Sequence, residues 1–515
     1  MKPSSVPFLI LVISVLVSCG GELGPSAEGL ADATSAASEG AVEPVSSVAP
    51  TTIAASESAV EPVNSVAPPT TADSSEGKPS SEVVASVNLA LPIESDEEAC
   101  RIPDPHEKDL DWEIRNVGFP VVFNNLEPSG VVQVAVIPVD WASYEGDPQD
   151  LSHDFGEVQR FVETYELVSK GLLRFETRTV DRWVRLPGSP EDYPQPQRSG
   201  NNVFLAQAAV DAADEVMDFT GVDILLVIIP TFTPIPVLAD GVYFPPNPQG
   251  IETPFHGSFE GFKWSAETHL ISEEGSITNW AGAGATFDAF PGRDRSNEWG
   301  FYVHEVGHMF SLPDWVAYQE EDRWYSPREG VEPERLSAGP WGYWSAMSPN
   351  NGPSRTFNSW SRWMLGWLGS EEIYCVDIRD GLKEGFQVAL SPLDVYEGGL
   401  KAIIFRTGEH TGFIIESRRP IGPDEGLEAW WYEAGVDPSG PIVYRVDTRR
   451  GNAEATLSIV PPDGQFYIDW FFSSRVDGST QLDAIYHTGD ASNVDGIFIK
   501  VLDAGGQQDF VSISS

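Results

Sequence analysis

The chain has 515 residues, of which 41% are hydrophobic, and it contains 16 tryptophans and 26 phenylalanines. A chain of this length and composition is long enough for two to four domains with sizeable hydrophobic cores. Its formal net charge of −47 at pH 7 argues against nucleic acid or an anionic lipid surface as a partner, because both are themselves negatively charged.

The N-terminus has the pattern of a secretion signal. Lys2 precedes an apolar run over residues 6–17, and this run is too short to span a bilayer comfortably as a helix. Residues 16–19, Leu-Val-Ser-Cys, resemble the cleavage box of bacterial lipoproteins. The resemblance implies a signal peptide over residues 1–19, lipidation of Cys19, and an extracytoplasmic lipoprotein that faces the cell surface or the periplasm of a bacterium. The alternative is a plain secretory signal.

Residues 20–97 have the composition of a disordered tether. They are rich in Ala, Ser, Pro and Thr, contain no aromatic residue, and repeat AVEPVSSVAPTT (41–52) as AVEPVNSVAPPT (59–70). Such a segment buries too little apolar surface to offset its ordering entropy. No later segment holds 18 consecutive apolar residues, so the sequence predicts contact with a membrane only through a lipid anchor.

Two cysteines, Cys100 and Cys375, remain beyond the signal. In an oxidising compartment two such thiols can pair as a disulfide, which would join the start of the folded part to a region far along the chain. The alternative is that they are two separate buried thiols.

The sequence predicts a first folded domain over residues 98–370. Apolar residues alternate or run continuously where strands are expected, and they recur at helical spacing between these runs. This order favours a mixed or parallel β-sheet with crossover helices. The expected elements are strand, helix, strand, helix and strand, over residues 130–141, 155–173, 174–186, 202–219 and 222–230.

The stretch His304-Glu305-Val306-Gly307-His308 carries the clearest chemistry. It lies in a predicted helix over residues 296–312, where positions four apart share one face, so both histidines could bind one metal ion. Glu305 would then lie beside the metal as a general base. Two histidines leave a tetrahedral zinc one protein ligand short, with a further position for water. The alternative is a helix with two half-buried histidines.

Asp314 and Met347 match a wider pattern. Metzincin-type zinc proteases end the zinc helix just after the second histidine and place a third ligand six residues beyond it, and Asp314 has that spacing from His308. Those proteases also carry a methionine in a turn beneath the metal, and Met347 lies in the turn-forming sequence WGYWSAMSPNNG. The rival third ligand is Glu332 or Glu334, downstream of the helix.

Three motifs, HEVGHMFSLPD, WSAMS and WSRWMLGWL, together resemble the immune inhibitor A family of secreted bacterial metallopeptidases. The resemblance covers roughly residues 130–510 and is sharpest over residues 300–368. It implies a zinc-dependent endopeptidase with a β-rich domain after the catalytic one.

The family pattern transfers to this chain residue by residue. The matched positions are the ligand histidines His304 and His308, the catalytic glutamate Glu305, the helix glycine Gly307, the turn methionine Met347 and the aspartate after Leu-Pro, Asp314. The chain departs from the family at Ser311, where the family usually has glycine. A serine in a left-handed conformation costs about 1–2 kcal/mol, and the position of Asp314 depends on that turn.

From residue 371 the sequence changes to short alternating runs punctuated by Gly, Asp and Pro. These runs predict an antiparallel β-sandwich over residues 371–515, after a metzincin-like zinc protease domain with a mixed β-sheet, so the whole chain is expected to be α+β. Acidic loops such as Asp437–Gly440 could hold Ca²⁺, although none matches a defined calcium loop.

The sequence therefore predicts a surface-tethered zinc endopeptidase that hydrolyses peptide bonds of extracellular proteins, with Zn²⁺ as cofactor and proteins or peptides as substrates. The alternative is a surface lipoprotein that has lost catalysis and uses the same fold for binding or adhesion. The intact set of His304, Glu305 and His308 favours the enzyme, because a degenerate binding protein is expected to lose one of them. Nothing in the sequence indicates an oligomeric state.

Overall fold

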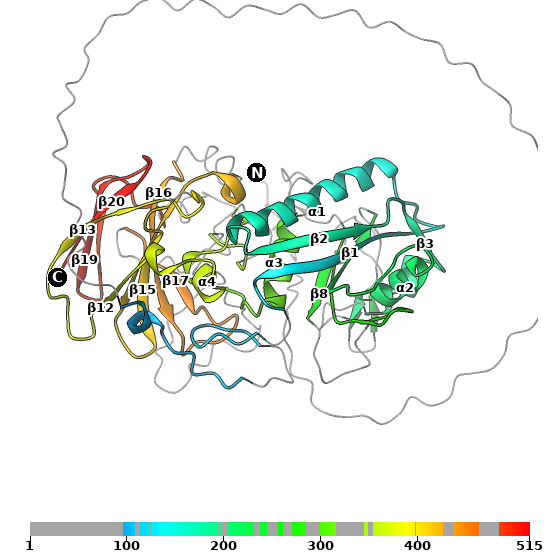
Figure 1. Ribbon diagram of the computed structural model, residues 1–515, viewed down its shortest axis with the longest axis horizontal. Helices are drawn as coiled ribbons and strands as arrows, with labels where there is room; N and C mark the ends of the chain where they lie inside the picture. Colours follow the sequence, from blue (N-terminus) through cyan, green and yellow to red (C-terminus); the bar gives the residue numbers. More distant parts are fainter. Residues whose placement is uncertain are drawn as a thin grey trace, which may run out of the picture. The chain divides into compact units, whose positions relative to one another are not determined.

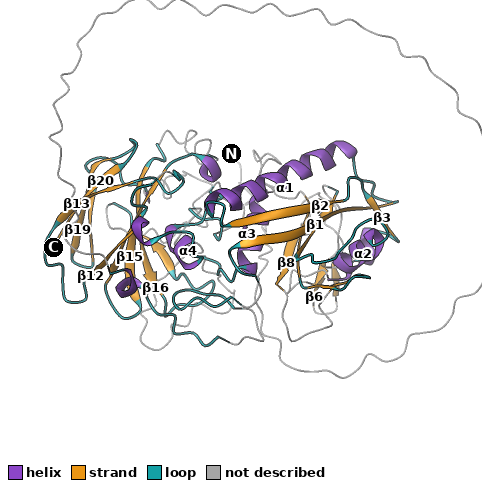
Figure 2. Cartoon of the chain, in the orientation of Figure 1, coloured by secondary structure: helices purple, strands orange, loops and turns teal. Residues whose placement is uncertain are grey.

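In the computed structural model, one compact unit contains every described residue, and its fold mixes a few helices with several β-sheets (Figure 1 and Figure 2). This composition is compatible with the predicted α+β class. The predicted signal peptide, Cys19 and nearly all of the predicted tether lie outside the described residues. The structure describes residues 96–108, 114–123, 126–193, 195–196, 203–230, 237–239, 242–244, 256–260, 270–284, 299–315, 344–348, 354–396, 398–425, 437–462 and 484–515.

The first sheet has the strand order β2-β1-β5-β11-β8, and β3 also pairs with β1. All its pairs are parallel except β8 with β11, so the predicted mixed sheet is confirmed. The continuous apolar run of β5 suits a strand that is covered on both faces. The strands are β1 (Gly130–Trp141), β2 (Leu173–Thr179), β3 (Val184–Leu186), β5 (Ile224–Ile229), β8 (His256–Glu260) and β11 (Asn279–Gly284).

Helices α1 (Pro148–Val168) and α2 (Val203–Ala213) cover opposite faces of this sheet. Successive side chains of a strand point to opposite faces, so Val134 joins the core on the α1 side and Ala135 joins the core on the α2 side. Figure 1 shows α1 running along β1 and β2. The sheet is thus a middle layer with a helix on each face.

The helix predicted over residues 155–173 is wrong at both ends. It starts at Pro148, because the side chain of Asp147 accepts a hydrogen bond from a first-turn amide at 2.8 Å and caps the helix. It ends at Val168, and Gly171 then takes a left-handed conformation with φ of 74°.

Two further predicted boundaries also move. The strand predicted over residues 174–186 is divided into β2 and β3, and the helix predicted over residues 202–219 ends at Ala213. Five short strands lie outside the first sheet in the described part of the chain before residue 300. Strand β4 pairs with β6, and β6 pairs with β7, while β9 and β10 form an antiparallel pair. Their bounds are β4 (Gln195–Pro196), β6 (Val237–Ala239), β7 (Val242–Phe244), β9 (Leu270–Ile271) and β10 (Ser276–Ile277).

Two sheets make up the described part beyond residue 370. Their strand orders are β12-β14-β15-β16-β17 and β13-β20-β19-β18. The prediction of wholly antiparallel pairing is wrong for β12 and β14, which run parallel; the other pairs are antiparallel. The strands are β12 (Ile373–Asp377), β13 (Phe386–Leu390), β14 (Ala402–Arg406), β15 (Thr411–Arg418), β16 (Gly440–Asp447), β17 (Leu457–Ile459), β18 (Ala491–Val494), β19 (Ile497–Asp503) and β20 (Asp509–Ser514).

The five-stranded sheet packs on both of its faces. Ile403 and Phe405 of β14 share a hydrophobic cluster with β19 and β20, whereas Ile404, between them, belongs to the large core that also contains α1. Helix α4 (Ser359–Met364) contributes Trp360 to the same large core. The predicted division between residues 370 and 371 stays a prediction, but hydrophobic packing is continuous across it.

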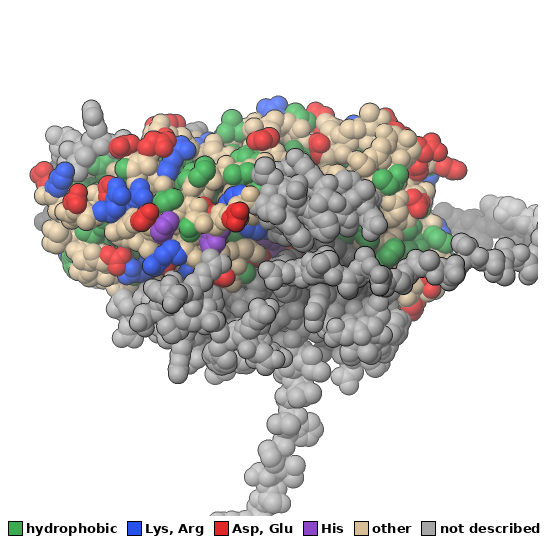
Figure 3. All heavy atoms as spheres, turned by 90° about the horizontal axis from the view of Figure 1, so that it is seen from below, with side chains coloured by type: hydrophobic (Ala, Val, Ile, Leu, Met, Phe, Trp, Pro, Cys, Tyr) green, Lys and Arg blue, Asp and Glu red, His purple; other side chains and the backbone are tan. Residues whose placement is uncertain are grey.

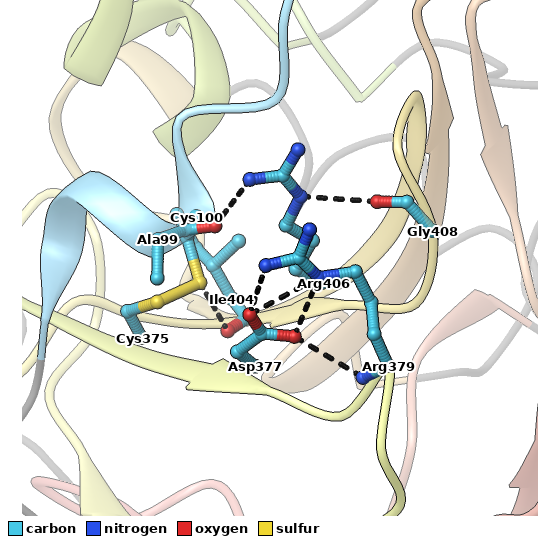
Figure 4. The surroundings of a disulfide bond; sticks show 8 residues. All are labelled: Ala99, Cys100, Cys375, Asp377, Arg379, Ile404, Arg406 and Gly408. Carbon is cyan, nitrogen blue, oxygen red and sulfur yellow. Dashed lines mark hydrogen bonds and ion pairs between the residues drawn. A yellow bond between two sulfur atoms is a disulfide. The ribbon is translucent and has the colours of Figure 1, made fainter.

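A disulfide joins Cys100 to Cys375, across 275 residues of sequence (Figure 4). Cys100 ends a short 3₁₀ helix (Glu97–Cys100), and Cys375 lies in β12. The Nη1 of Arg406 donates a hydrogen bond to the carbonyl of Ala99 at 2.8 Å beside this bond. The first described segment is therefore fastened to the five-stranded sheet.

On the face drawn in Figure 3, acidic and basic side chains of the described residues are intermixed. Several exposed or half-buried arginines are paired with carboxylates; Arg445, for example, lies 2.7 Å from Asp495. Such pairs contribute little to stability, but they partly neutralise the basic groups. Among the described residues, no helix is both long and apolar enough to cross a bilayer.

Candidate metal centre

Helix α3 (Trp299–Met309) carries His304 and His308, and every one of its residues is buried. Its first turn is held by α1, because the carboxylate of Glu157 accepts a hydrogen bond from the Trp299 amide at 3.1 Å. Further along, the hydroxyl of Tyr165 donates to the carbonyl of Val303 at 2.8 Å. Two contacts from α1 therefore set the position of the histidine-bearing helix over the sheet.

The chain turns sharply after α3. Ser311 has a φ of 60°, so this serine adopts a left-handed conformation that favours glycine, at a cost of about 1–2 kcal/mol. Its amide donates to the carbonyl of His308 at 2.8 Å, and the Leu312 amide donates to the carbonyl of Gly307 at 3.2 Å. This is the hydrogen-bond pattern of a Schellman motif. The Asn116 amide, from the described segment 114–123, donates to the Ser311 carbonyl at 2.9 Å and supports the turn.

The turn brings Asp314 to the two histidines. Its Oδ1 lies 3.3 Å from the Nε2 of His304 and 3.5 Å from the Nε2 of His308. All three candidate ligand atoms lie within 4.8 Å of one another. The three residues are 4%, 1% and 2% exposed, in the order His304, His308 and Asp314, so they form a compact and desolvated group. In the part of the chain that the structure describes, no other histidine, cysteine and carboxylate cluster of this kind is found.

The second nitrogen of each histidine is engaged by a backbone carbonyl. The Nδ1 of His304 lies 2.8 Å from the carbonyl of Ala346, and the Nδ1 of His308 lies 2.9 Å from that of Leu312. A carbonyl can only accept, so each Nδ1 carries a proton, and in the neutral imidazole each Nε2 then presents its lone pair toward Asp314. This tautomer and this orientation are those of metal-binding imidazoles.

Asp314 has the environment of a carboxylate that needs a cation. Neither of its oxygens accepts a geometrically sound hydrogen bond from a described residue. Burial raises the pKa of Asp314, but the positive charges and hydrogen bonds that His308 and His304 supply when doubly protonated outweigh burial and hold this pKa well below its ordinary value. When both imidazoles are neutral, a bound metal ion would supply that positive charge. A buried, charged carboxylate is stable only when it is paired or coordinates a metal. The donor set of two imidazole nitrogens and one carboxylate oxygen fits a divalent metal ion.

Met347 lies directly against α3. It is fully buried, and its carbonyl accepts a hydrogen bond from the Trp315 amide at 2.8 Å, next to Asp314. A Cβ added to Gly307 would lie only 2.4 Å from the Sδ of Met347. Any side chain larger than that of glycine at position 307 would therefore force the buried Met347 thioether to move.

We expect Gly307→Ala to destabilise the protein by about 1–3 kcal/mol, because the added methyl group overpacks a fully buried contact. Gly156→Ala is the matched control, since a Cβ at Gly156, in α1, meets no atom within 4 Å. That change should stabilise the protein by about 0.5–1 kcal/mol. Denaturant unfolding of both variants measures the difference; stabilisation by both would show that Met347 does not fill this space.

Glu305 is 2% exposed and follows His304 on α3. Adjacent residues of an α-helix are turned by about 100° from each other, so Glu305 borders the helix face that carries the two histidines. The rival ligands Glu332 and Glu334 lie outside the described residues. Cys100 and Cys375 are joined away from this cluster, at the five-stranded sheet.

Sequence reasoning missed the residues that support the site but lie far from it along the chain. Asn116 donates a hydrogen bond to the Ser311 carbonyl, and Glu157 accepts one from the first amide of α3. The Oδ1 of Asn452 accepts a hydrogen bond from the Asp314 amide at 2.7 Å. No local pattern marks them, because each partner lies in a different segment. In comparisons with known proteins, no family model and no curated protein matches the chain.

Proposed function

We propose that this protein is a zinc-dependent endopeptidase. The observation that carries the proposal is the buried convergence of His304, His308 and Asp314, with Glu305 on the same helix. Zinc favours imidazole nitrogen and carboxylate oxygen ligands, and catalytic zinc sites use three protein ligands so that one position stays open. The same set is poorly suited to Ca²⁺ or Mg²⁺, which prefer ligands that are all oxygen.

The family proposal has separate support. Asp314 follows His308 by six residues, the turn between them is left-handed at Ser311, and Met347 lies against the helix. These are the features that relate the chain to metzincin-type proteases and to the immune inhibitor A family. The two sheets beyond residue 370 share a hydrophobic cluster, which supports a β-sandwich after the catalytic domain.

The roles of the side chains follow from their chemistry. When bound, zinc would supply Lewis-acid chemistry, polarising a carbonyl and making water easier to deprotonate. Glu305 would accept a proton from the attacking water on its carboxylate and later donate that proton to the leaving amine nitrogen. His304 and His308 would keep their Nε2 atoms directed at the metal through the carbonyls that hold each Nδ1.

Digestion of casein tests the proposal, with mass spectrometry of the products. An endopeptidase should produce internal fragments, and 1,10-phenanthroline should abolish their formation. A surface protein that uses the fold only for binding or adhesion would leave casein intact under the same conditions. Cleavage that continues unchanged in the presence of the chelator would contradict the zinc mechanism.

The anchoring proposal is tested separately. Cys19→Ser should move the protein from the membrane fraction to the soluble fraction, because one acyl-bearing residue is the proposed attachment. Membranes are washed with high salt so that electrostatic adhesion does not contribute. A variant that partitions as the wild type does would remove Cys19 lipidation from the account.

A further inference from the structure

A loop far along the sequence holds Asp314 by its backbone. The Asp314 amide donates to the Oδ1 of Asn452 at 2.7 Å, and the Asp314 carbonyl accepts a hydrogen bond from the Ala453 amide at 3.1 Å. The two positions Asp314 and Asn452 are 138 residues apart. Both backbone polar groups of the candidate ligand are therefore bonded to one dipeptide.

The loop that makes this contact has a costly conformation. Ala453 and Ala455 have φ of 55° and 59°, in the left-handed region that costs a residue with a Cβ about 1–2 kcal/mol. Backbone strain of this kind persists only where the surroundings over-determine the chain, and it is concentrated at functional sites and ligand clamps. Two such residues within three positions, beside a candidate metal ligand, point to a role at that ligand.

Internal hydrogen bonds make the loop a firm support. The Gly451 amide donates to the Oε2 of Glu454 at 2.7 Å, and the hydroxyl of Thr456 donates to the Gly451 carbonyl at 2.9 Å. The Asp447 amide, at the end of β16, donates to the Thr456 carbonyl at 2.9 Å. The loop is thus closed on itself and fastened to the five-stranded sheet where it meets the ligand.

Trp315, the residue after Asp314, is held by hydrogen bonds to two other segments. The Trp315 amide donates to the Met347 carbonyl at 2.8 Å, while the indole nitrogen of Trp315 donates to the hydroxyl of Ser361 at 2.9 Å. The backbone at Asp314 is therefore fixed by its own two bonds and by those of its neighbour. The carboxylate then adjusts only through its side-chain torsions.

We infer that Asn452 is a positioning residue, which fixes the backbone of Asp314 so that its carboxylate is preorganised for a metal ion. The affinity of the site then depends on the loop after β16, and not on α3 and its turn alone. Ligands held by firm neighbours bind a metal more tightly, because less order must be created when it binds. The inference rests on the proposed metal site.

The test is the zinc affinity of the purified full-length protein, measured by competition with a chromophoric chelator. Asn452→Leu has nearly the same size but no acceptor, and we expect it to bind zinc about 10- to 100-fold more weakly than the wild type. Asn452→Asp keeps an oxygen at the accepting position and should recover most of that loss. The recovery separates positioning from a general effect on stability.

Asn493→Leu is the matched control. The Oδ1 of Asn493, near the end of β18, accepts a hydrogen bond at 3.0 Å from the amide of Gly496, in the turn that leads to β19. This change removes the same type of bond outside the metal centre and should leave zinc affinity unchanged. If Asn452→Leu does not fold, Asn452→Ala carries the test, because it removes the acceptor with less added apolar surface.

Two results would overturn the inference and leave the proposed function intact. The first is that the wild type binds zinc and that Asn452→Leu and Asn493→Leu bind it with the same affinity as each other. The second is an equal loss in Asn452→Leu and Asn452→Asp, since the latter keeps the acceptor. A wild-type protein that binds no zinc would overturn the metal site, and the positioning role with it.

Discussion

Glu305→Gln should lower the rate of peptide hydrolysis by about 100- to 10,000-fold, because it removes the group that carries the proton from water to the leaving amine. Glutamine has nearly the same shape as glutamate, and Glu305 is not among the three residues whose ligand atoms converge. Zinc content and the unfolding midpoint should therefore stay at their wild-type values. The measurement is the initial rate of cleavage of a fluorogenic casein, with metal content determined on the same samples.

Glu176→Gln is the control for this change. Glu176 is exposed on β2, where it accepts a hydrogen bond from the Gln133 side chain at 2.7 Å. This variant should cleave at the wild-type rate. A Glu305→Gln variant that keeps its zinc and also keeps the wild-type rate would remove Glu305 from the mechanism.

Asp314→Ala should weaken zinc binding by more than the 100-fold that marks the upper range for residues that only support a ligand, because it removes one of three protein ligands. The stabilisation that zinc gives the folded protein, about 4 kcal/mol at a thousandfold excess over the wild-type Kd, should fall to about 1.4 kcal/mol or less. Thermal unfolding with and without zinc measures this loss, and hydrolysis should fall in parallel.

The metal-free protein distinguishes a ligand from a structural ion pair. Asp314 is a buried carboxylate whose oxygens have no sound hydrogen bond from a described residue, and burial of a charge costs several kcal/mol. When both imidazoles are neutral, neither of them pairs with this carboxylate as a cation, so the metal-free Asp314→Ala variant should be at least as stable as the metal-free wild type. Glu332→Ala and Glu334→Ala should bind zinc as the wild type does. Zinc retained by Asp314→Ala and lost by either glutamate variant would assign the third ligand to that glutamate.

Local patterns predicted the elements that depend on local forces. The alternating and continuous apolar runs placed β1 and β5, and the spacing of His304 and His308 placed them on one helix face. The boundaries that failed depend on single contacts at the ends of elements. The Asp147 cap, for instance, starts α1 seven residues before its predicted start, in a stretch whose only aliphatic residue is Leu151.

The supports of the site could not be predicted in the same way. Asn452 meets Asp314 only because the five-stranded sheet carries the loop after β16 back to the turn that follows α3. Glu157 likewise reaches the start of α3 from a separate helix. Such pairs are set by tertiary packing, and neither partner shows a motif in its own segment. Ser311 is a different case, because its backbone takes a left-handed conformation that its residue type does not favour.

Anomalous X-ray diffraction at the zinc absorption edge, on crystals of the zinc-loaded protein, tests the central claim most directly, because it locates the metal without reference to any substrate. We predict one strong peak whose nearest protein atoms are the Nε2 of His304, the Nε2 of His308 and a carboxylate oxygen of Asp314. A peak bounded by other side chains, or none at this cluster in zinc-loaded crystals, would contradict the account.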